Sequence, residues 1–273
     1  MKVENILAKV KNIKKEFKKR EIPFVDRHTH TITKYTKSFD LPKKIVFGEI
    51  PIEKPSLQII QFASNVPFDE IAITDHSYEI ILSKNTKETT QIQKNYGEKS
   101  LDKYIEYTEK VKRKYSKTKV LSGIELKVTS LKDFEFFDVD KLNQLDIILI
   151  ESTIEKLNFN IIRKKFREKI IILAHPDINN YLRKSNNQRY ISKLIDNLVN
   201  NQIHFEISRQ FLNDFLLNWH IYKDFFKIAA QKGLLFSIGS DYHCIVGNYF
   251  KFFKSILEIV KKYDLTGNNF LKL

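Results

Sequence analysis

Seven short runs rich in branched apolar side chains recur along this chain, and longer stretches with helical periodicity separate them. The short runs cover residues 24–28, 70–74, 119–124, 145–150, 169–174, 203–207 and 234–238. The helix-like stretches lie near 56–65, 99–116, 155–167, 187–200, 211–231 and 247–262. Strands that alternate with helices in this way build a parallel sheet with right-handed crossovers. The pattern therefore predicts an α/β protein, with seven strands closing into a barrel of the (β/α) type.

The first part of the chain differs from this alternating region. Residues 1–23 are basic and amphipathic, with apolar side chains at helical spacing before Pro23: Ile6, Val10, Ile13 and Phe17. We expect a helix that covers one end of a barrel domain spanning 24–273, in preference to a membrane or RNA tether. Residues 31–55 contain three prolines and are predicted to form a long loop over the mouth of the barrel.

Composition limits the class of protein. The 273 residues are 42% hydrophobic and 29% charged, which is typical of a soluble globular chain. The single Cys244 cannot form an intrachain disulfide, and neither a membrane-length apolar run nor a secretory core is evident, so we expect a cytoplasmic protein. The net charge of +14 favours anionic partners: phosphorylated metabolites, nucleic acid or acidic lipid.

Each predicted strand carries ionisable side chains at or just after its carboxyl end. They are, in chain order, Asp26, His28, His30, Asp75, His76, Glu125, Glu151, His175, Glu206, Asp241 and His243. The carboxyl ends of the strands of a β/α barrel meet on one face, which is where active sites lie. Five of the seven histidines fall in this set, so the sequence predicts a metal site at the mouth of the barrel.

The spacing of these residues suits a metal ion. In His28-Thr29-His30 the two-residue period of a strand places both imidazoles on one face, and Asp241-Tyr242-His243 repeats that arrangement. Glu125 has two carboxylate oxygens and can bridge two ions. A mixed set of imidazoles and carboxylates suits Zn²⁺, Mn²⁺ or Fe²⁺.

Six segments at these strand ends resemble the motifs of the PHP-domain family of metallophosphoesterases, in the family's order. They are DRHTHT (26–31), IAITDHS (71–77), SGIEL (122–126), LAHPD (173–177), FEIS (205–208) and IGSDYH (238–243). The family includes polymerase-associated and histidinol-phosphatase types. The resemblance spans residues 24 to about 260, and it implies a distorted (β/α)₇ barrel that holds up to three divalent ions.

The resemblance also implies a ligand set. His28, His30, Glu125 and Asp241 would hold the first ion, Glu125 with His175 the second, and His76 with His243 the third. Two positions depart from the family pattern. Glu151 stands where the fourth strand of the family ends in a ligand histidine, and we predict it as a substitute ligand. The usual further ligand soon after His30 is missing, and Asp40 is a distant candidate. Two to three ions are expected.

These residues predict a mechanism. Divalent ions lower the pKa of bound water to about 7 and neutralise phosphoryl oxygens during in-line displacement. His76 or His243 would protonate the leaving oxygen, and Arg209, just past the sixth strand, would bind the substrate phosphate. We expect a small phosphorylated substrate, a phosphomonoester similar to histidinol phosphate or to a nucleotide. Asp26, Asp75 and Glu206 are expected to orient the ligands.

Two other interpretations stay open at the level of sequence. One is a degenerate PHP module that binds nucleic acid or a protein partner without turnover, which the missing histidine and the positive charge favour. The other is an amidohydrolase-type metal hydrolase, which also uses a His-x-His pair and a late aspartate. The early Thr-Asp-His segment and Glu125 favour the phosphoesterase.

Overall fold

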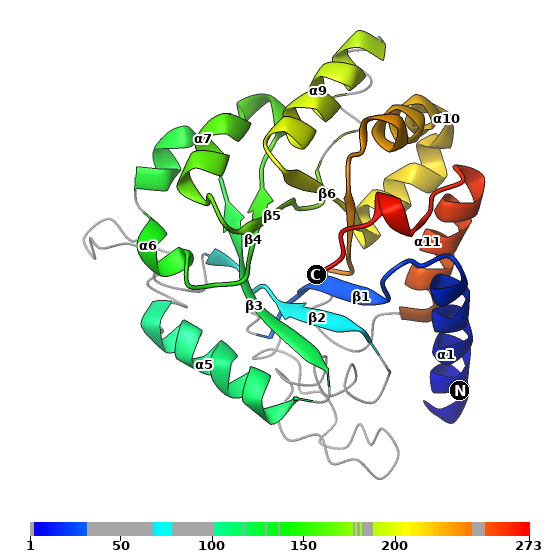
Figure 1. Ribbon diagram of the computed structural model, residues 1–273, viewed down its shortest axis with the longest axis horizontal. Helices are drawn as coiled ribbons and strands as arrows, with labels where there is room; N and C mark the ends of the chain where they lie inside the picture. The colour runs from blue at the N-terminus through cyan, green and yellow to red at the C-terminus, as the bar shows by residue number, and fades with distance from the viewer. Residues whose placement is uncertain are drawn as a thin grey trace.

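The computed structural model describes residues 3–31, 68–77, 101–116, 118–128, 130–135, 137–176, 178, 181, 188–241 and 249–273, apart from the side chains of 3–7, 131, 214 and 216–221. Within this part of the chain, seven parallel strands follow one another in sequence order, and helices surround them (Figure 1). The predicted fold class, a distorted (β/α)₇ barrel with an extra N-terminal helix, is confirmed.

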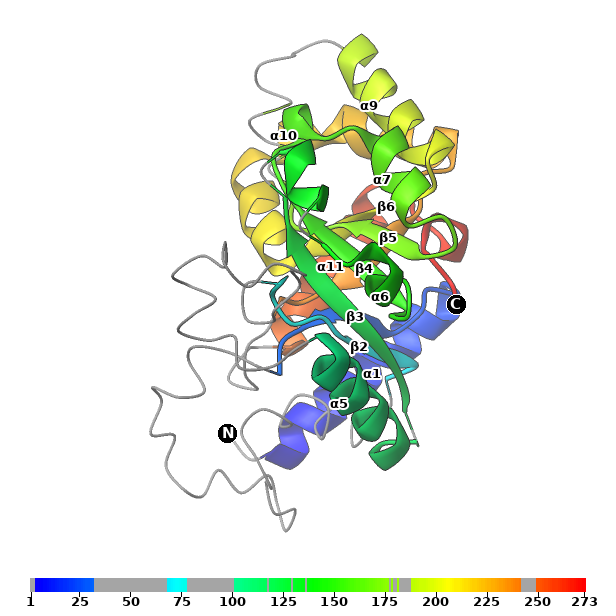
Figure 2. The same ribbon diagram turned by 90° about the vertical axis from the view of Figure 1, so that its left-hand side faces the viewer.

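The strands are β1 (Val25–Thr29), β2 (Glu70–Ile73), β3 (Lys119–Lys127), β4 (Ile147–Glu151), β5 (Ile170–Leu173), β6 (Ile203–Ser208) and β7 (Phe236–Gly239). The α-helices are α1 (Val3–Lys19), α5 (Leu101–Lys114), α6 (Val139–Leu142), α7 (Phe159–Lys165), α9 (Gln188–Asn200), α10 (Arg209–Lys232) and α11 (Tyr249–Lys262). Short 3₁₀ turns are η3 (Leu131–Glu135), η4 (Ile154–Lys156) and η5 (Gly267–Asn269). Figure 2 shows the strands of the barrel from the side.

The boundaries differ from the predicted ones in places where pairing or capping decides them. Strand β3 runs on to Lys127 because that residue still pairs with Glu151 of β4. Helix α7 begins only at Phe159 because the side chain of Asn158 caps it, accepting a hydrogen bond from the backbone N–H of Ile161. The predicted helix at 56–65 and the predicted loop at 31–55 lie outside the described residues.

Two apolar layers hold the barrel together. A small cluster of inward-facing side chains fills the barrel interior: Ala72, Leu121, Ile147, Leu149, Ile172 and Ala174. A much larger cluster lies between the sheet and the helices and includes Ile71 and Ile73 of β2. The two-residue alternation along β2 therefore separates inward from outward positions, as expected of a strand covered on both faces.

Strand β1 contains a bulge that determines which of its side chains face the interior. Asp26 pairs with Ile71, but Thr29 pairs with Ile73, so three steps along β1 match two steps along β2. Partners in a parallel pair face the same side of the sheet, and both isoleucines face outward. Asp26 and Thr29 therefore face the helices, whereas His28 faces the barrel interior.

The seam between β7 and β1 is closed largely by the Asp26 side chain. Its carboxylate, which is fully buried, accepts hydrogen bonds from the backbone N–H of Ser240 at 2.8 Å and from the Ser240 hydroxyl at 2.6 Å. One backbone bond, from the N–H of Asp241 to the carbonyl of His28 at 2.9 Å, lies next to it. Asp26 thus links the first strand to the last and brings the ends of β1 and β7 together.

The opposite end of the seam is filled by the C-terminal tail. The N–H of Leu271 donates to the carbonyl of Phe236 in β7, and Arg27 donates from Nη1 to the carbonyl of Leu271 at 3.1 Å. Arg27 and Glu70 form a buried ion pair at 2.5 Å, so the guanidinium charge is compensated inside the barrel. Figure 1 shows the C-terminus near the centre of the barrel.

Asp26 generates a prediction about stability. Burial raises its pKa to about 6, although hydrogen bonds from Ser240 favour the ionised form. The folded chain therefore binds this proton more tightly than the unfolded chain, and the resulting stabilisation is lost as the pH rises through 6. Asp26→Asn removes the titration. The free energy of unfolding of this variant, relative to that of wild type, should increase by about 2 kcal/mol between about pH 4 and pH 7.

Urea unfolding at several pH values in that range measures this difference. Asp140→Asn is the matched control for the loss of an aspartate, because Asp140 is exposed. A difference between wild type and Asp26→Asn that does not change with pH would show that Asp26 is not the group that titrates.

Candidate metal centre

The described residues of the predicted site lie at one end of the barrel. His28, Glu125 and Glu151 belong to the last residues of β1, β3 and β4, while His30, His76, His175 and Asp241 follow β1, β2, β5 and β7. His243 and Asp40 lie outside the described residues. The structure therefore brings seven of the predicted metal ligands to the carboxyl ends of the strands, the face that carries active sites in β/α barrels.

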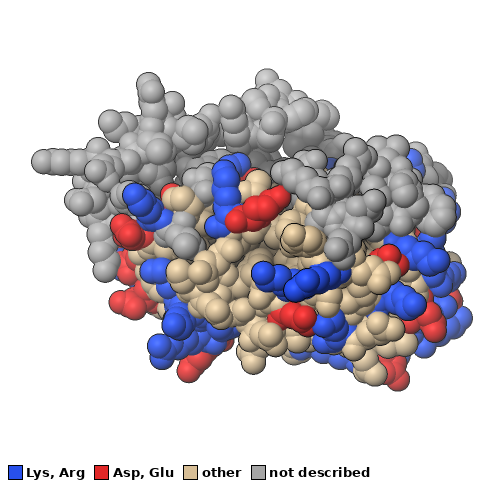
Figure 3. Space-filling model, turned by 90° about the horizontal axis from the view of Figure 1, so that it is seen from above, with Lys and Arg blue, Asp and Glu red and all other residues tan. Residues whose placement is uncertain are grey.

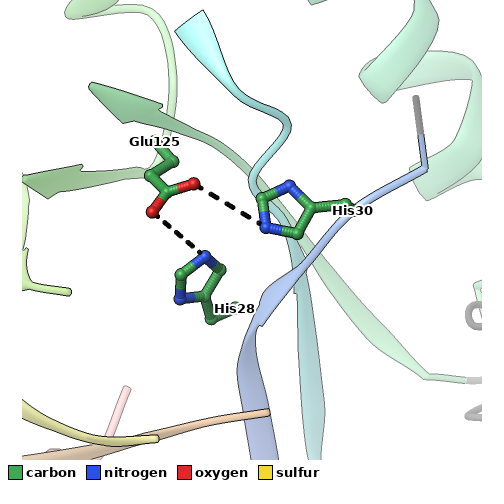
Figure 4. A group of neighbouring side chains, drawn as sticks. All are labelled: His28, His30 and Glu125. Atoms are coloured by element: carbon green, nitrogen blue, oxygen red, sulfur yellow. Dashed lines mark ion pairs between the residues drawn. The ribbon is translucent and has the colours of Figure 1, made fainter. Parts of the chain in front are cut away.

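Glu125 is the centre of the cluster. Its side chain is fully buried, and four imidazoles surround it. Oε1 lies 2.8 Å from Nε2 of His175 and 3.5 Å from Nε2 of His28, while Oε2 lies 3.7 Å from Nε2 of His30 and also contacts Nδ1 of His76. Figure 4 shows His28 and His30 turned toward the two oxygens of this carboxylate. The ligand atoms of Glu125, His28 and His30 all lie within 4.8 Å of one another.

Asp241 adds a second carboxylate on the β7 side. Its Oδ1 lies 3.2 Å from Nε2 of His30 and 3.7 Å from Nε2 of His28. The backbone of Asp241 is left-handed, with φ of 53°, and that of His175 has φ of 23°. Both conformations are costly for residues other than glycine, and such strain concentrates at functional sites.

Charge compensation explains the protonation of the cluster. Burial opposes ionisation of Glu125, but the charge of His28 and the hydrogen bond from His175 hold the pKa of Glu125 well below its usual value. Burial lowers the pKa of His30 to about 3, so its imidazole is neutral at pH 7. Burial also disfavours the charged form of His28, but Glu206 and Glu125 outweigh it and raise the pKa of His28. A cation that bound here would displace that proton.

An outer set of carboxylates orients these groups. Oε1 of Glu206 lies 2.8 Å from Nδ1 of His28, and its Oε2 accepts the backbone N–H of His175 at 2.6 Å. Glu206 thereby holds the proton of His28 on Nδ1 and directs Nε2 into the cluster. Asp75 accepts hydrogen bonds from the N–H and the hydroxyl of Thr31, which fixes the backbone that follows His30.

The geometry of the cluster fits a divalent ion. Nε2 of His28 is buried and has no hydrogen-bond partner among the described residues, although Glu125 and Asp241 lie at 3.5 and 3.7 Å. Two ligand atoms that are each about 2.1 Å from one tetrahedral ion lie about 3.4 Å apart. The separations of 3.5 Å between Glu125 and His28 and of 3.7 Å between Glu125 and His30 are therefore close to those of ligands around one ion, and Asp241 lies 3.2–3.7 Å from the same two imidazoles.

Two predicted residues lie at the edge of this arrangement. Glu151 is partly exposed and forms an ion pair with Lys127 at 3.0 Å. Arg209 is exposed at the first position of α10, directly after Ser208, whose hydroxyl caps that helix.

A cavity of about 290 Å³ adjoins the cluster. Its lining includes His175 and Glu151 together with residues that the sequence pattern did not single out: Lys127, Val128, Ser152, Thr153, Lys156 and Gln210. One of them, Lys127, could have been predicted from the sequence. Lys127 stands two positions after Glu125 on the same strand, and the period of two places it on the same face, at the mouth of the barrel.

The fold and the site together define a β/α-barrel protein with a candidate metal centre at its mouth. Among solved structures, the chain is similar to the histidinol phosphate phosphatase from Lactococcus lactis subsp. lactis, crystallised with zinc, L-histidinol and phosphate. The TM-score is 0.56 and the sequence identity 14%, over 92% of this chain and 100% of that chain. At this identity the likeness is one of fold.

A weaker likeness is to a chain in the cryo-EM structure of an archaeal ribonuclease P with mature tRNA. Its TM-score is 0.43 and its identity 16%, over 88% of this chain and 89% of that chain. No protein-family profile and no curated protein sequence matches the chain.

Gly239 provides a test of the site geometry. A Cβ added there would lie 2.1 Å from Oε1 of Glu206 and 2.6 Å from Cβ of His28. Gly239→Ala should therefore displace both side chains and weaken zinc binding by about tenfold or more. Competition against a chromogenic zinc chelator measures the affinity.

Gly233→Ala is the matched control. Gly233 has φ of 74° and no atom within 4 Å of an added Cβ, so the substitution should cost about 1 kcal/mol of stability and leave zinc affinity unchanged. Equal zinc affinity in the two variants would contradict the proposed position of the metal centre.

Proposed function

We propose that the protein is a divalent-metal-dependent phosphoesterase that hydrolyses a phosphomonoester by means of activated water. The observation that carries this proposal is the buried cluster of His28, His30 and Glu125 at the mouth of the barrel. The similarity in fold to a phosphatase crystallised with zinc and phosphate supports the same reaction class. The function thus rests on the chemistry of the cluster, with the fold as supporting context.

The proposed ligand set begins with His28, His30 and Glu125, whose ligand atoms lie within 4.8 Å of one another, and with Asp241, which lies against the two imidazoles. Glu125 also contacts His175 and His76, so it is placed to serve more than one ion. Glu151 would join as a ligand on release from Lys127, and His243 would complete the set. We propose two to three ions of zinc, manganese or iron, because mixed imidazole and carboxylate sites suit these metals.

The chain's own residues have separate roles in this proposal. A divalent cation in the cluster supplies the charge that makes water nucleophilic at neutral pH and that neutralises phosphoryl oxygens. Glu206 keeps the Nε2 lone pair of His28 directed into the site. His76 is slightly exposed at the mouth and, with His243, is the proposed donor of a proton to the leaving oxygen.

The cavity beside His175 is the proposed position of a small phosphorylated substrate, similar to histidinol phosphate or to a nucleotide. Lys127, Lys156 and Gln210 line it, so two ammonium groups and an amide are available to phosphate oxygens. Arg209, next to Gln210 on the first turn of α10, is proposed to bind the phosphate.

We place this activity in the cytoplasm, as the single cysteine suggests. Among the described helices, none combines the length and the apolar character needed to cross a bilayer.

The proposal predicts turnover of a phosphomonoester. With added Mn²⁺ or Zn²⁺, the chain should hydrolyse p-nitrophenyl phosphate, and His28→Ala should reduce kcat/KM by about a thousandfold because a metal ligand is removed. Release of nitrophenol measures the rate. His204→Gln, a histidine of β6 outside the cluster, is the control and should keep most of the activity. Turnover that is unchanged in His28→Ala, or that is absent with every metal and phosphomonoester tried, would refute the proposal.

A further inference from the structure

We infer that helices α1 and α11 together form a surface that binds the phosphate backbone of double-stranded nucleic acid without sequence preference. We call this surface the basic face and define it by the exposed side chains of Lys11, Lys15, Lys18, Lys254 and Lys261. It is separate from the candidate metal centre, and the inference does not depend on the proposed phosphoesterase activity.

The positive charge of the protein is concentrated on these two helices. Helix α1 has 17 residues and α11 has 14, and together they contain ten lysines and three glutamates. These 31 residues therefore carry half of the net charge of +14 in about a ninth of the 273-residue chain. A lysine-rich composition alone would spread the charge evenly, so this concentration needs another explanation.

The two helices lie side by side on the outside of the barrel (Figure 1). The rings of Phe17 and Phe253 meet edge to face at 5.6 Å, and Lys9 lies over the ring of Phe250 at 5.5 Å. Near the other end of α1, Lys19, and to a smaller extent Lys261, lower the pKa of Glu16. In Figure 1 the two helices run in the same general direction.

The burial pattern of the two helices shows that the lysines of the basic face point toward solvent. Among the described side chains of α1, the apolar ones that pack on the domain are Val10, Ile13 and Phe17, and those of α11 are buried as well, apart from the partly buried Phe250. Lys11, Lys15 and Lys18 follow one another at spacings of four and three, which forms one row over about 10 Å of helix. Lys254 and Lys261 form a second row, in which Lys254 also lies 3.9 Å from Oε1 of the exposed Glu258. Packed helices lie about 8–10 Å apart, so the two rows are neighbours.

This surface fits a phosphate backbone better than a membrane. The exposed side chains described on α1 and α11 are lysines, apart from Ala8, Asn12 and Glu258. An interfacial helix needs large exposed apolar side chains to insert into a bilayer, and the large apolar side chains described on these two helices are buried or partly buried. Exposed aromatic side chains, which stack on the bases of single strands, are likewise missing from the described part of the face. Lysines are point charges that contact phosphates without reading bases.

Other parts of the surface show a different distribution of charge. On the face over α7, α9 and α10, Lys and Arg side chains are interspersed with Asp and Glu (Figure 3). Pairs such as Lys232 with Asp196, at 2.6 Å, neutralise charge there. This face supplies a control, because lysines can be removed from its helices with the same change in net charge.

The test is binding of a 24-base-pair duplex of scrambled sequence, as DNA and as RNA, followed by fluorescence anisotropy between about 50 and 200 mM salt. The face variant carries Lys11→Gln, Lys15→Gln, Lys18→Gln and Lys261→Gln. The control carries Lys164→Gln, Lys193→Gln, Lys223→Gln and Lys227→Gln, all at exposed positions. A third variant carries arginine at the four face positions, and thermal unfolding checks that all are folded.

We expect wild type to bind both duplexes with a steep dependence on salt. The face variant should bind about 30-fold more weakly at low salt, and its plot of log K against log salt should be shallower by about 3, close to 0.9 for each phosphate that is no longer neutralised. The control and the arginine variant should stay within about threefold of wild type. DNA and RNA should behave alike, because phosphates are the shared feature.

Three results would overturn the inference. The first is no binding of either duplex by wild type at about 50 mM salt. The second is an equal drop in affinity in the face and control variants, which would indicate attraction by net charge alone. The third is that wild type binds vesicles of anionic phospholipid but neither duplex, and that the face variant does not bind the vesicles. The surface would then be a membrane-binding one.

Discussion

The compensation of one buried negative charge organises the mouth of this barrel. Glu125 sits in the interior, where an unpaired carboxylate is strongly disfavoured. Four imidazoles from three other strand ends gather around it, and Asp241 from a fifth lies against two of them. With two carboxylates and several imidazoles in contact, the cluster is suited to a cation, which would replace protons as the compensating charge.

The strand geometry also brings the side chains of this cluster together. The bulge in β1 turns Asp26 outward to close the seam with β7 and leaves His28 facing inward, so one strand both completes the barrel and supplies the site. Gly239 lets Glu206 and His28 meet where a larger residue would collide with both. Left-handed backbone at His175 and Asp241 adds strain that the surrounding contacts must offset.

Much of this could be predicted from the sequence, because strand periodicity and strand ends are local properties. The alternating pattern predicts the barrel, and the position of ionisable residues after each run places His28, His30, Glu125 and Asp241 on one rim. The bulge could not be predicted, since it depends on which residue of β2 pairs with Asp26. The ion pair of Glu151 with Lys127 could not be predicted for a similar reason. It depends on the extension of β3 to Lys127, three residues past the predicted end of that strand.

Glu125 and the imidazoles around it are proposed to hold divalent metal. Elemental analysis of the purified chain, loaded with zinc or manganese and then desalted, tests it most directly when wild type and Glu125→Gln are compared. We expect two to three ions per wild-type chain and the loss of at least one in Glu125→Gln, with both chains folded. A single ion in wild type would mean that Glu151 stays in its ion pair with Lys127 and is not a metal ligand. No retained ion in wild type, or equal content in the two chains, would contradict the claim.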